Sequence, residues 1–347
     1  MTKRKLKVFV AISGGVDSSV AAALLKKRNY DVVGVHMKCY NLDGCGEQEA
    51  EDARRAAEIL KIPFYVFDFE KEYKDKVVEY IVEGYRKGIT PNPDVMCNKE
   101  IKFGMFLKGA LAMGADYVAT GHYVRLQNQK LFQAKDKNKD QSYFLWTLTQ
   151  EQLKHCLFPI GEYIKPQVRK LAKKFGLPNA EKKDSQGICF LGKIALKDFL
   201  KSYLPEKKGI VLNTSGQIIG EHNGAHFCTI GQRHLGIYQQ PIINSQQPLY
   251  VAEKDIKSNA ILVAEEDHPM LYKKEVKLKS VNLLNKELRI PVMARVRYRQ
   301  PLVPAKFIAY NSLFKLVFSK PVKFVASGQS AVFYSQKGEM LGGGVIV

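Results

Sequence analysis

The sequence has no apolar stretch long enough to span a membrane, so we expect a protein without membrane segments. The first predicted strand begins near residue 7, which leaves no room for a signal or transit peptide. Six cysteines in 347 residues are too few for a disulfide-stabilised secreted domain. We also find no internal repeat and no low-complexity tract. Together these absences predict a cytoplasmic protein with two or three globular domains.

Acidic residues are scarce relative to basic ones. The chain has 34 aspartates and glutamates against 54 lysines and arginines, which gives a net charge of +20. A surplus of this size favours a polyanionic partner such as nucleic acid. A lysine-rich proteome would give the same composition without any such partner, so composition alone does not separate the two interpretations.

A glycine-rich turn, "SGGVDSS", follows the first apolar segment. It lies between a predicted strand at 7–12 and a predicted helix at 18–28. Such a turn presents backbone N–H groups beside the positive end of a helix, which favours phosphate. The turn lacks the lysine of a P-loop and the spacing of a dinucleotide-binding fingerprint. A capped tight turn is the alternative, but it needs only one glycine and one cap.

The first half of the chain alternates predicted strands and helices. Strands are expected at 30–37, 63–69 and 116–123, and helices at 49–60, 72–85, 101–113 and 166–175. This alternation predicts an α/β fold with a doubly wound parallel sheet, in which ligands bind at the carboxyl ends of the strands. The loop 13–18, Met37 and the pair Gly121-His122 would then share one ATP pocket.

Beyond about residue 204 the turn signals become dense and the predicted strands short. In "PVMARVRYRQ" (291–300), Arg295, Arg297 and Arg299 alternate with apolar residues. Lys277 and Lys279 alternate in the same way in "EVKLKS". A β-rich region with basic strand faces suits a phosphate backbone, although a solvated face is the simpler interpretation of either strand alone.

Two cysteines lie in unusual surroundings. Cys97, in "TPNPDVMCNKEIKF", is predicted near a helix N-terminus with Lys99 and Lys102 nearby, and both features lower a thiol pKa. Asp94 lies three residues earlier, close enough to exchange protons with it. Cys189 lies in a glycine-containing loop, "DSQGICFLG".

The other cysteines carry weaker signals. Cys39, Cys156 and Cys228 are expected to be small buried hydrophobic residues, and Cys45 an exposed loop thiol without a role. A metal site from His36, Cys39 and Cys45 is weakly supported because no paired C-x-x-C follows. We therefore predict no protein-bound metal.

Eight segments occur in a specific order: "SGGVDSS", "TPNPDVMCNKEIKF", "TGHY", "KDQSYFL", "DSQGICFLG", "NGAHF", "RYRQ" and "GQSAVFY". In this order they resemble the tRNA-specific 2-thiouridylase family of the ATP pyrophosphatase superfamily, over nearly the whole chain. Thr90 stands where the family has an arginine, and Cys228 where a tyrosine is usual. The stretch after "GQR" is slightly shorter. These departures affect expected RNA contacts and not the reacting groups.

The resemblance implies an activity: ATP with Mg²⁺ adenylates the C2 oxygen of a tRNA wobble uridine, and sulfur replaces that oxygen. Cys189 would carry the sulfur as a persulfide, Cys97 would be the second thiol and close a transient Cys97–Cys189 disulfide, and Asp94 would act as acid or base. The implied partners are the Lys, Glu and Gln tRNAs and a cysteine desulfurase or sulfur-relay protein. The implied state is a monomer.

The resemblance also assigns residues and domains. ATP would be bound by Ala11, Ile12, Ser13, Gly14, Gly15, Val16, Asp17, Ser18, Met37 and Gly121. The tRNA and its target base would be contacted by Asn92, Pro93, Asp94, His122, Lys139, Asp140, Gln141, Arg297, Tyr298 and Gln329. A catalytic domain would span 1–204, a small central tRNA-contacting domain 205–269, and a C-terminal β-barrel 270–347.

Alternatives remain open at this point. Another adenylating enzyme of the superfamily would need neither the cysteine pair nor the basic β-rich region. A 4-thiouridine synthetase normally carries further RNA-binding or sulfur-carrier domains. A non-catalytic RNA-binding protein with a relict nucleotide loop would not release pyrophosphate. An iron–sulfur cluster on Asp94, Cys97 and Cys189 is a minor alternative, since only two thiols are available.

Overall fold

The computed structural model describes residues 4–40, 42, 44–183, 194–233, 238–239, 248–284, 291–311 and 313–347. The chain divides into two compact units. The first contains Met1–Val77, Pro93–Ile194 and Lys337–Met340, and the second contains Val78–Asn92, Ala195–Gln336 and Leu341–Val347. Within the described ranges, no helix has the length and apolar character needed to cross a bilayer.

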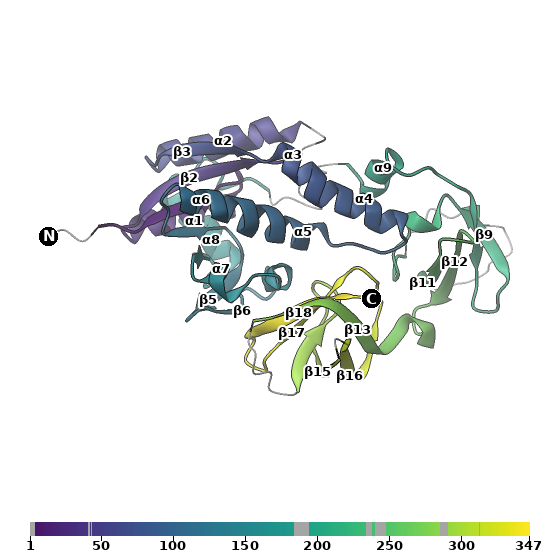
Figure 1. The fold of residues 1–347 in the computed structure, drawn as a ribbon. Coiled ribbons are helices and arrows are strands. Elements are labelled where there is room, and N and C mark those ends of the chain that lie inside the picture. The colour runs from purple at the N-terminus through teal and green to yellow at the C-terminus, as the bar shows by residue number, and fades with distance from the viewer. Residues whose placement is uncertain are drawn as a thin grey trace. The chain divides into compact units, whose positions relative to one another are not determined.

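The first unit is built on a five-stranded sheet in the order β3-β2-β1-β4-β7 (Figure 1). Its strands are β1 (Lys7–Ala11), β2 (Asp31–Lys38), β3 (Phe64–Asp68), β4 (Tyr117–Ala119) and β7 (Cys156–Leu157). All four strand pairings are parallel. The strand order reverses at β1, which has β2 on one side and β4 on the other. The predicted doubly wound parallel sheet is therefore confirmed, with its ligand-binding crevice expected between β1 and β4.

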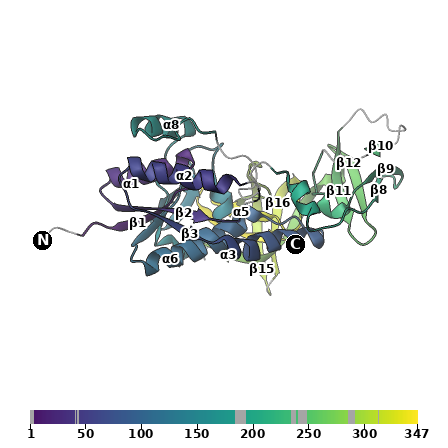
Figure 2. The same ribbon diagram turned by 90° about the horizontal axis from the view of Figure 1, so that it is seen from above.

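Helices cover both faces of this sheet, as the view in Figure 2 shows. On one face lie α1 (Val16–Lys27), α2 (Cys45–Ile59) and α8 (Lys165–Lys174), and on the other lies α6 (Leu107–Ala112). Val20 and Leu24 of α1 join Val8 and Val10 of β1 in the core. Cys45 is the first residue of α2, so the predicted loop position for it was wrong.

Two helices of the first unit contain π-helical turns. One runs through α3 (Glu70–Tyr73), η1 (Lys74–Val78) and α4 (Glu79–Arg86), with its second half assigned to the second unit. The other runs through α5 (Pro93–Met96), η2 (Cys97–Phe106) and α6. Remaining elements of the first unit are β5 (Val124–Gln127), β6 (Lys130–Gln133), η3 (Ser142–Leu145) and α7 (Gln150–Leu153). Such π-helical turns are rare and often occur at functional sites, and η2 begins at Cys97.

The second unit contains α9 (Leu196–Lys201) and a sheet in the order β10-β9-β8-β12-β11. The strands are β8 (Gly209–Leu212), β9 (Ile218–His222), β10 (Tyr238–Gln239), β11 (Leu249–Asp255) and β12 (Ala260–Glu265), with η5 (Ala225–Phe227) after β9. Val211, Val251 and Val263 form its core.

The C-terminal part of this unit is a closed barrel in the order β13-β16-β15-β14-β17-β18. After η6 (Pro269–Leu271) come β13 (Tyr272–Leu283), β14 (Val292–Arg295), β15 (Val303–Tyr310), β16 (Leu313–Lys323), β17 (Ser330–Tyr334) and β18 (Met340–Ile346). The predicted β-barrel is thus confirmed. The expected ends of the three domains stay predictions.

One basic strand face was predicted wrongly. The strand expected over 291–300 ends at Arg295, and Arg299 has a left-handed backbone with φ of 65°. Arg295 is only 7% exposed. Its Nη2 donates to the Tyr334 hydroxyl at 3.0 Å, and its guanidinium lies 5.1 Å from the centre of that ring. In β13, by contrast, Lys277 is exposed between buried neighbours as expected.

Candidate active site

The turn between β1 and α1 is held by its own serines. The Ser18 hydroxyl accepts a hydrogen bond from the Ser13 N–H at 3.1 Å and donates to the Gly15 carbonyl at 3.1 Å. Gly14 has a φ of 76°, and a Cβ there would lie 2.5 Å from the Glu49 carbonyl oxygen. Gly15 is the N-cap of α1 and has no side chain to satisfy the first helical N–H groups. The turn therefore has the form of an anion-binding loop.

The segment after β4 lies against this loop. A Cβ on Gly121 would lie 2.6 Å from the Ser18 nitrogen, so only glycine allows the two backbones to approach this closely. The side chain of His122 then hydrogen-bonds through Nδ1 to the Thr120 hydroxyl at 2.8 Å. The structure thus brings together the loop 13–18 and Gly121-His122, as the sheet topology predicted.

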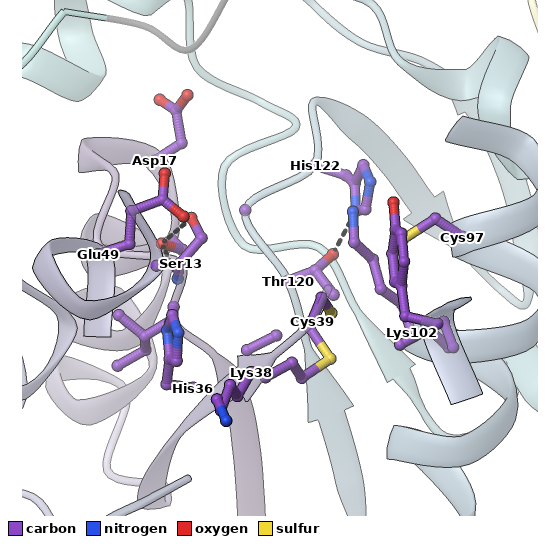
Figure 3. Close-up of a pocket in the computed structure, with 18 of the residues that line it drawn as sticks. Ser13, Asp17, His36, Lys38, Cys39, Glu49, Cys97, Lys102, Thr120 and His122 are labelled. Atoms are coloured by element: carbon purple, nitrogen blue, oxygen red, sulfur yellow. Dashed lines mark hydrogen bonds between the residues drawn. The ribbon is translucent and has the colours of Figure 1, made fainter. Parts of the chain in front are cut away.

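A cavity of about 300 Å³ opens at this edge of the sheet. Figure 3 shows Ser13 and Asp17 on one side, which we call the phosphate-loop wall. Cys97, Lys102 and His122 lie on the other side, which we call the thiol wall. The predicted site residues that line the cavity are Ala11, Ile12, Ser13, Asp17, Ser18, Met37, Cys97, Gly121, His122 and Gln141. Gly14, Gly15 and Val16 belong to the loop and its helix but are not among the lining residues.

Cys97 does not lie at a free helix end. It follows α5 without a break, because Met96 already has right-handed helical backbone angles. The side chain is buried, and this burial raises the pKa of the thiol above its ordinary value. The charge of Lys102 lowers this pKa in part, as does a hydrogen bond from the Tyr73 hydroxyl. The nearby Asp94 carboxylate raises it further. The expected lowering of the thiol pKa by a helix N-terminus was therefore wrong.

Two further titratable groups share this electrostatic environment. Burial raises the pKa of Asp94, in the first turn of α5, and the charge of Lys102 partly offsets the rise. Burial also lowers the pKa of His122 well below its ordinary value, and Lys102 adds to that effect. His122 is therefore a neutral imidazole at pH 7, suited to accept a proton or a hydrogen bond.

Cys39 was expected to be an inert core residue and is not. It is partly exposed and lines the cavity close to Lys38 (Figure 3). Cys156 and Cys228 are buried as expected, and burial raises the pKa of Cys156 to about 12. His36 hydrogen-bonds through Nδ1 to the Ile12 carbonyl at 3.1 Å. The residues described by the structure include no cluster of three or more metal-ligating side chains.

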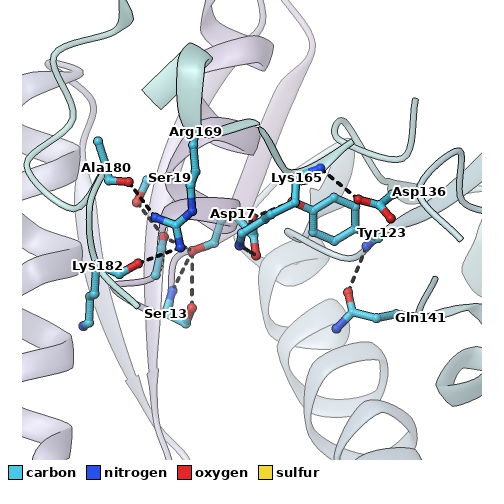
Figure 4. Close-up of polar contacts among 12 residues, drawn as sticks. Ser13, Asp17, Ser19, Tyr123, Asp136, Gln141, Lys165, Arg169, Ala180 and Lys182 are labelled. Carbon is cyan, nitrogen blue, oxygen red and sulfur yellow. Dashed lines mark hydrogen bonds and ion pairs between the residues drawn. The ribbon is translucent and has the colours of Figure 1, made fainter. Parts of the chain in front are cut away.

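Sequence reasoning missed Lys165, which comes from α8 and reaches the phosphate-loop wall. Its ammonium lies 2.9 Å and 2.8 Å from the two carboxylate oxygens of Asp17. The Tyr123 hydroxyl donates to the same carboxylate at 2.8 Å, and the Lys165 N–H donates to Asp136 at 2.9 Å (Figure 4). The only signal was the Lys-Pro pair at the start of a predicted helix, which indicates capping and not a site.

A second missed group ties the segment after α8 to the phosphate loop. Asn179 donates to the Gly14 carbonyl at 3.0 Å and lies 2.9 Å from the Ser19 hydroxyl. Arg169 donates to the carbonyls of Ala180 and Lys182 (Figure 4). Lys182 in turn pairs with Asp52 at 2.7 Å. Cys189, the expected persulfide carrier, lies outside the described residues.

The predicted tRNA contacts of the first unit differ in exposure. Asp140 is only 2% exposed, and its carboxylate accepts hydrogen bonds from the Ala134 and Ser142 N–H groups at 3.1 Å and 3.2 Å. This carboxylate therefore organises the loop, and a direct contact with tRNA does not fit its burial. Lys139 is partly exposed, and Gln141 accepts from the Tyr123 N–H at 2.9 Å. Pro93 begins α5.

The predicted contacts of the second unit are Asn92, Arg297, Tyr298 and Gln329. Gln329 donates to the Thr90 carbonyl at 3.0 Å, and Asn92 itself is buried. Arg297 lies 5.9 Å from the ring centre of Phe324 and is partly exposed, as is Tyr298. A hydrogen-bonding role within the protein is thus visible for Gln329, whereas contact with tRNA stays a prediction for all of them.

Three family models match successive parts of the chain. They are described as "tRNA methyl transferase HUP domain" (residues 6–193), "tRNA methyl transferase PRC-barrel domain" (197–265) and "Aminomethyltransferase beta-barrel domain" (273–346). Among solved structures, a 4-thiouridine synthetase in complex with RNA and ATP is 17% identical. It matches with a TM-score of 0.35 over 57% of this chain and 50% of its own. NMN synthetase from Francisella tularensis is 18% identical, with a TM-score of 0.35 over 52% and 66%. These scores carry no argument about function.

Curated relatives are far more similar. "tRNA-specific 2-thiouridylase MnmA 1" from Geobacillus kaustophilus is 45% identical over 346 residues, covering 95% of this chain and 93% of the relative. "tRNA-specific 2-thiouridylase MnmA" from Idiomarina loihiensis is 43% identical over 364 residues, covering 100% and 97%. Two of the model descriptions name methyl transfer, but these relatives span nearly the whole chain and are named for thiolation. The chain belongs to the tRNA-specific 2-thiouridylase family, whose members are tRNA sulfurtransferases.

Proposed function

We propose that this protein uses ATP to replace the C2 oxygen of the wobble uridine in tRNA with sulfur. The observation that carries the proposal is that residues of the anion-binding loop 13–18 and Cys97 line the same cavity. An adenylating enzyme without sulfur chemistry has no use for a thiol facing its phosphate loop. A relict nucleotide loop has no use for a glycine at 121 that packs on Ser18.

The proposed reaction has two stages. The uracil O2 attacks the α-phosphorus of ATP, the bond to the β-phosphate breaks, and pyrophosphate leaves. A persulfide sulfur then attacks C2, and the C2–O bond breaks with the oxygen departing in AMP. Attack of the Cys97 thiolate on Cys189 breaks the S–S bond to the product and forms a Cys97–Cys189 disulfide. A cellular thiol reductant then restores both thiols.

The phosphate-loop wall would hold the pyrophosphate portion of ATP. The free N–H groups at the start of α1 and the hydroxyls of Ser13 and Ser18 are suited to phosphate oxygens. Met37 and Gly121 also line the cavity and would border the nucleoside. Lys165 brings a positive charge to the same wall through its ion pair with Asp17.

Mg²⁺ fits this wall as a companion of ATP. Asp17 and Glu49 both line the cavity, and their carboxylates are hard oxygen donors. Mg²⁺ is commonly held by one or two carboxylates together with substrate phosphates and water. The metal would neutralise phosphate charge while the loop holds the leaving group.

The thiol wall would receive the base and the sulfur. Asp94 and the neutral His122 would exchange protons with the base. Cys189 belongs to this step by resemblance alone. We propose that the basic barrel residues Arg297 and Lys277, with Tyr298, help to hold the tRNA, and that the unstacked wobble base enters the pocket at modest cost. A cysteine desulfurase or sulfur-relay protein would supply the sulfur in the cytoplasm, with the enzyme acting as a monomer.

The test is a reconstituted reaction. Purified protein is incubated with unmodified tRNA, ATP, Mg²⁺ and a persulfide-charged desulfurase, and the nucleosides are measured by mass spectrometry. We expect 2-thiouridine at the wobble position with one pyrophosphate released per modified tRNA. The proposal fails if pyrophosphate is released without sulfur entering tRNA, which would indicate another adenylating enzyme. It also fails if tRNA binds and neither product forms.

A further inference from the structure

The helix that carries Cys97 has an unusual hydrogen-bonding pattern. Residues 97–106 form the π-helix η2, in which each turn closes between residues five apart. Cys97 and Lys102 are separated by five positions, so the π-helical turn places both on one face. In an α-helix a residue five positions on would point about 140° away. The geometry therefore directs Lys102 into the cavity that Cys97 lines.

Three groups on or beside the thiol wall respond to this one lysine. The charge of Lys102 acts on Asp94, on Cys97 and on His122. Burial favours the neutral form of all three, because a low-dielectric surrounding disfavours any charge. Lys102 opposes burial at the carboxyl and the thiol, and reinforces it at the imidazole. His122 packs against η2 through Phe103, with ring centres 6.0 Å apart, which fixes its place beside the lysine.

We propose that Lys102, which shares a face of η2 and a cavity with Cys97, is a positioning residue for sulfur transfer whose ammonium group favours the thiolate of Cys97. The proposal rests on the proposed function, in which Cys97 acts as a thiolate nucleophile. Cys97 attacks sulfur as a thiolate, so a protonated thiol would be inactive. Lys102 thus offsets the effect of burial on this nucleophile.

Other groups facing Cys97 have different effects. Tyr73, from α3, donates a hydrogen bond that favours the thiolate, and the Asp94 carboxylate disfavours it. Lys99 is a neighbour in sequence, but it is exposed and pairs with Glu100 at 3.0 Å. The remaining titratable residues that line the cavity are Asp17, His36, Lys38, Cys39, Tyr40, Glu49 and His122.

The test measures the thiol directly. The alkylation rate of Cys97 by iodoacetamide is followed by peptide mass spectrometry over a pH range around the ordinary thiol pKa of about 8.5. Lys102→Met should move the midpoint to higher pH and slow alkylation near pH 8 roughly tenfold. Lys102→Arg keeps the charge and should restore the wild-type profile. Lys99→Met is the matched control on the same helix and should leave it unchanged. Cys156 serves as an unreactive internal reference.

A second readout links the thiol to turnover. If Lys102 acts through the thiolate, thiolation by Lys102→Met falls at neutral pH and recovers as the pH rises. A profile for Lys102→Met that superimposes on the wild type overturns the proposal, as does an equal shift in Lys99→Met. Lys102→Gln is a second neutral variant, and loss of folding in both neutral variants also overturns the proposal, because a charge-setting role predicts folded proteins. The alkylation assay contains no ATP, tRNA or sulfur donor, so its outcome is independent of failure of the proposed function.

Discussion

The phosphate-loop wall and the thiol wall differ in how their side chains come to share a cavity. In the phosphate-loop wall, the serine hydrogen bonds that shape the loop join residues five or fewer positions apart, such as Ser13 with Ser18. In the thiol wall, Cys97 contacts Tyr73 from another helix, and burial has the largest effect on the pKa of its thiol. Local sequence therefore specifies the shape of the loop, whereas the reactivity of the thiol depends on tertiary packing.

The largest effect should come from removing the Asp17 carboxylate of the phosphate-loop wall. Asp17→Ala should reduce pyrophosphate release by at least about a hundredfold, since a group that organises phosphate charge is lost. tRNA binding should remain close to wild type, because this wall is proposed to bind ATP and not RNA. Both are measured by a coupled pyrophosphate assay and by filter binding.

The exposed Asp31, at the start of β2, provides a matched control as Asp31→Ala. Pyrophosphate release by Asp17→Ala at the wild-type rate would remove this residue from the ATP site. Equal loss in the control would show that the assay reports general damage to the sheet.

A change in the thiol wall should affect only one product. Cys97→Ser is expected to abolish 2-thiouridine formation with a persulfide donor, because serine cannot resolve the persulfide adduct. Pyrophosphate release should persist, because adenylation needs neither thiol. Quantifying both products in one reaction checks this, and full thiolation by the variant would contradict the two-thiol mechanism.

The sequence predicted the features that depend on local contacts and missed those that depend on tertiary packing. The loop 13–19 and the parallel sheet were predictable because turn chemistry and hydrophobic periodicity are local signals, whereas the barrel was implied only by the family resemblance. The ion pair between Asp17 and Lys165 spans 148 positions, and no local pattern reports it. The contacts of Asn179 with the loop are similarly distant.

Two errors have the same physical origin. Cys97 was expected to gain acidity from a helix end, but the helix continues through it and burial dominates. Arg295 was expected on a basic face because it alternates with apolar residues. It packs instead on Tyr334, since an arginine can bury its guanidinium against an aromatic ring. Alternation does not identify which side of a strand is covered.

A smaller effect should come from removing the ion pair between Lys165 of α8 and Asp17 of the phosphate-loop wall. Lys165→Met is expected to weaken ATP binding about tenfold, because a charge-assisted contact at the phosphate site is worth roughly 1.5 kcal/mol. Isothermal titration with a non-hydrolysable ATP analogue measures the change. Lys170→Met, on the exposed side of the same helix, is the control and should bind normally. Unchanged affinity in Lys165→Met would make its ion pair with Asp17 purely structural.

The smallest effect compares two arginines of one barrel segment. Arg297→Ala should reduce the slope of log affinity against log salt by about one unit, if the side chain contacts one phosphate. Arg295→Ala should lower the thermal stability of the protein and leave that slope unchanged, because Arg295 is buried. tRNA binding at several salt concentrations distinguishes them, and a slope change in Arg295→Ala alone would reverse the assignment.

The central claim is that ATP activates the C2 oxygen which sulfur then displaces. It can be tested with tRNA whose wobble uridine carries oxygen-18 at C2, in the reaction with ATP and a persulfide donor. The account predicts one oxygen-18 atom in the phosphate of each AMP formed per 2-thiouridine. Formation of 2-thiouridine with AMP that contains no oxygen-18 would contradict it, because the departing oxygen would then not have been adenylated.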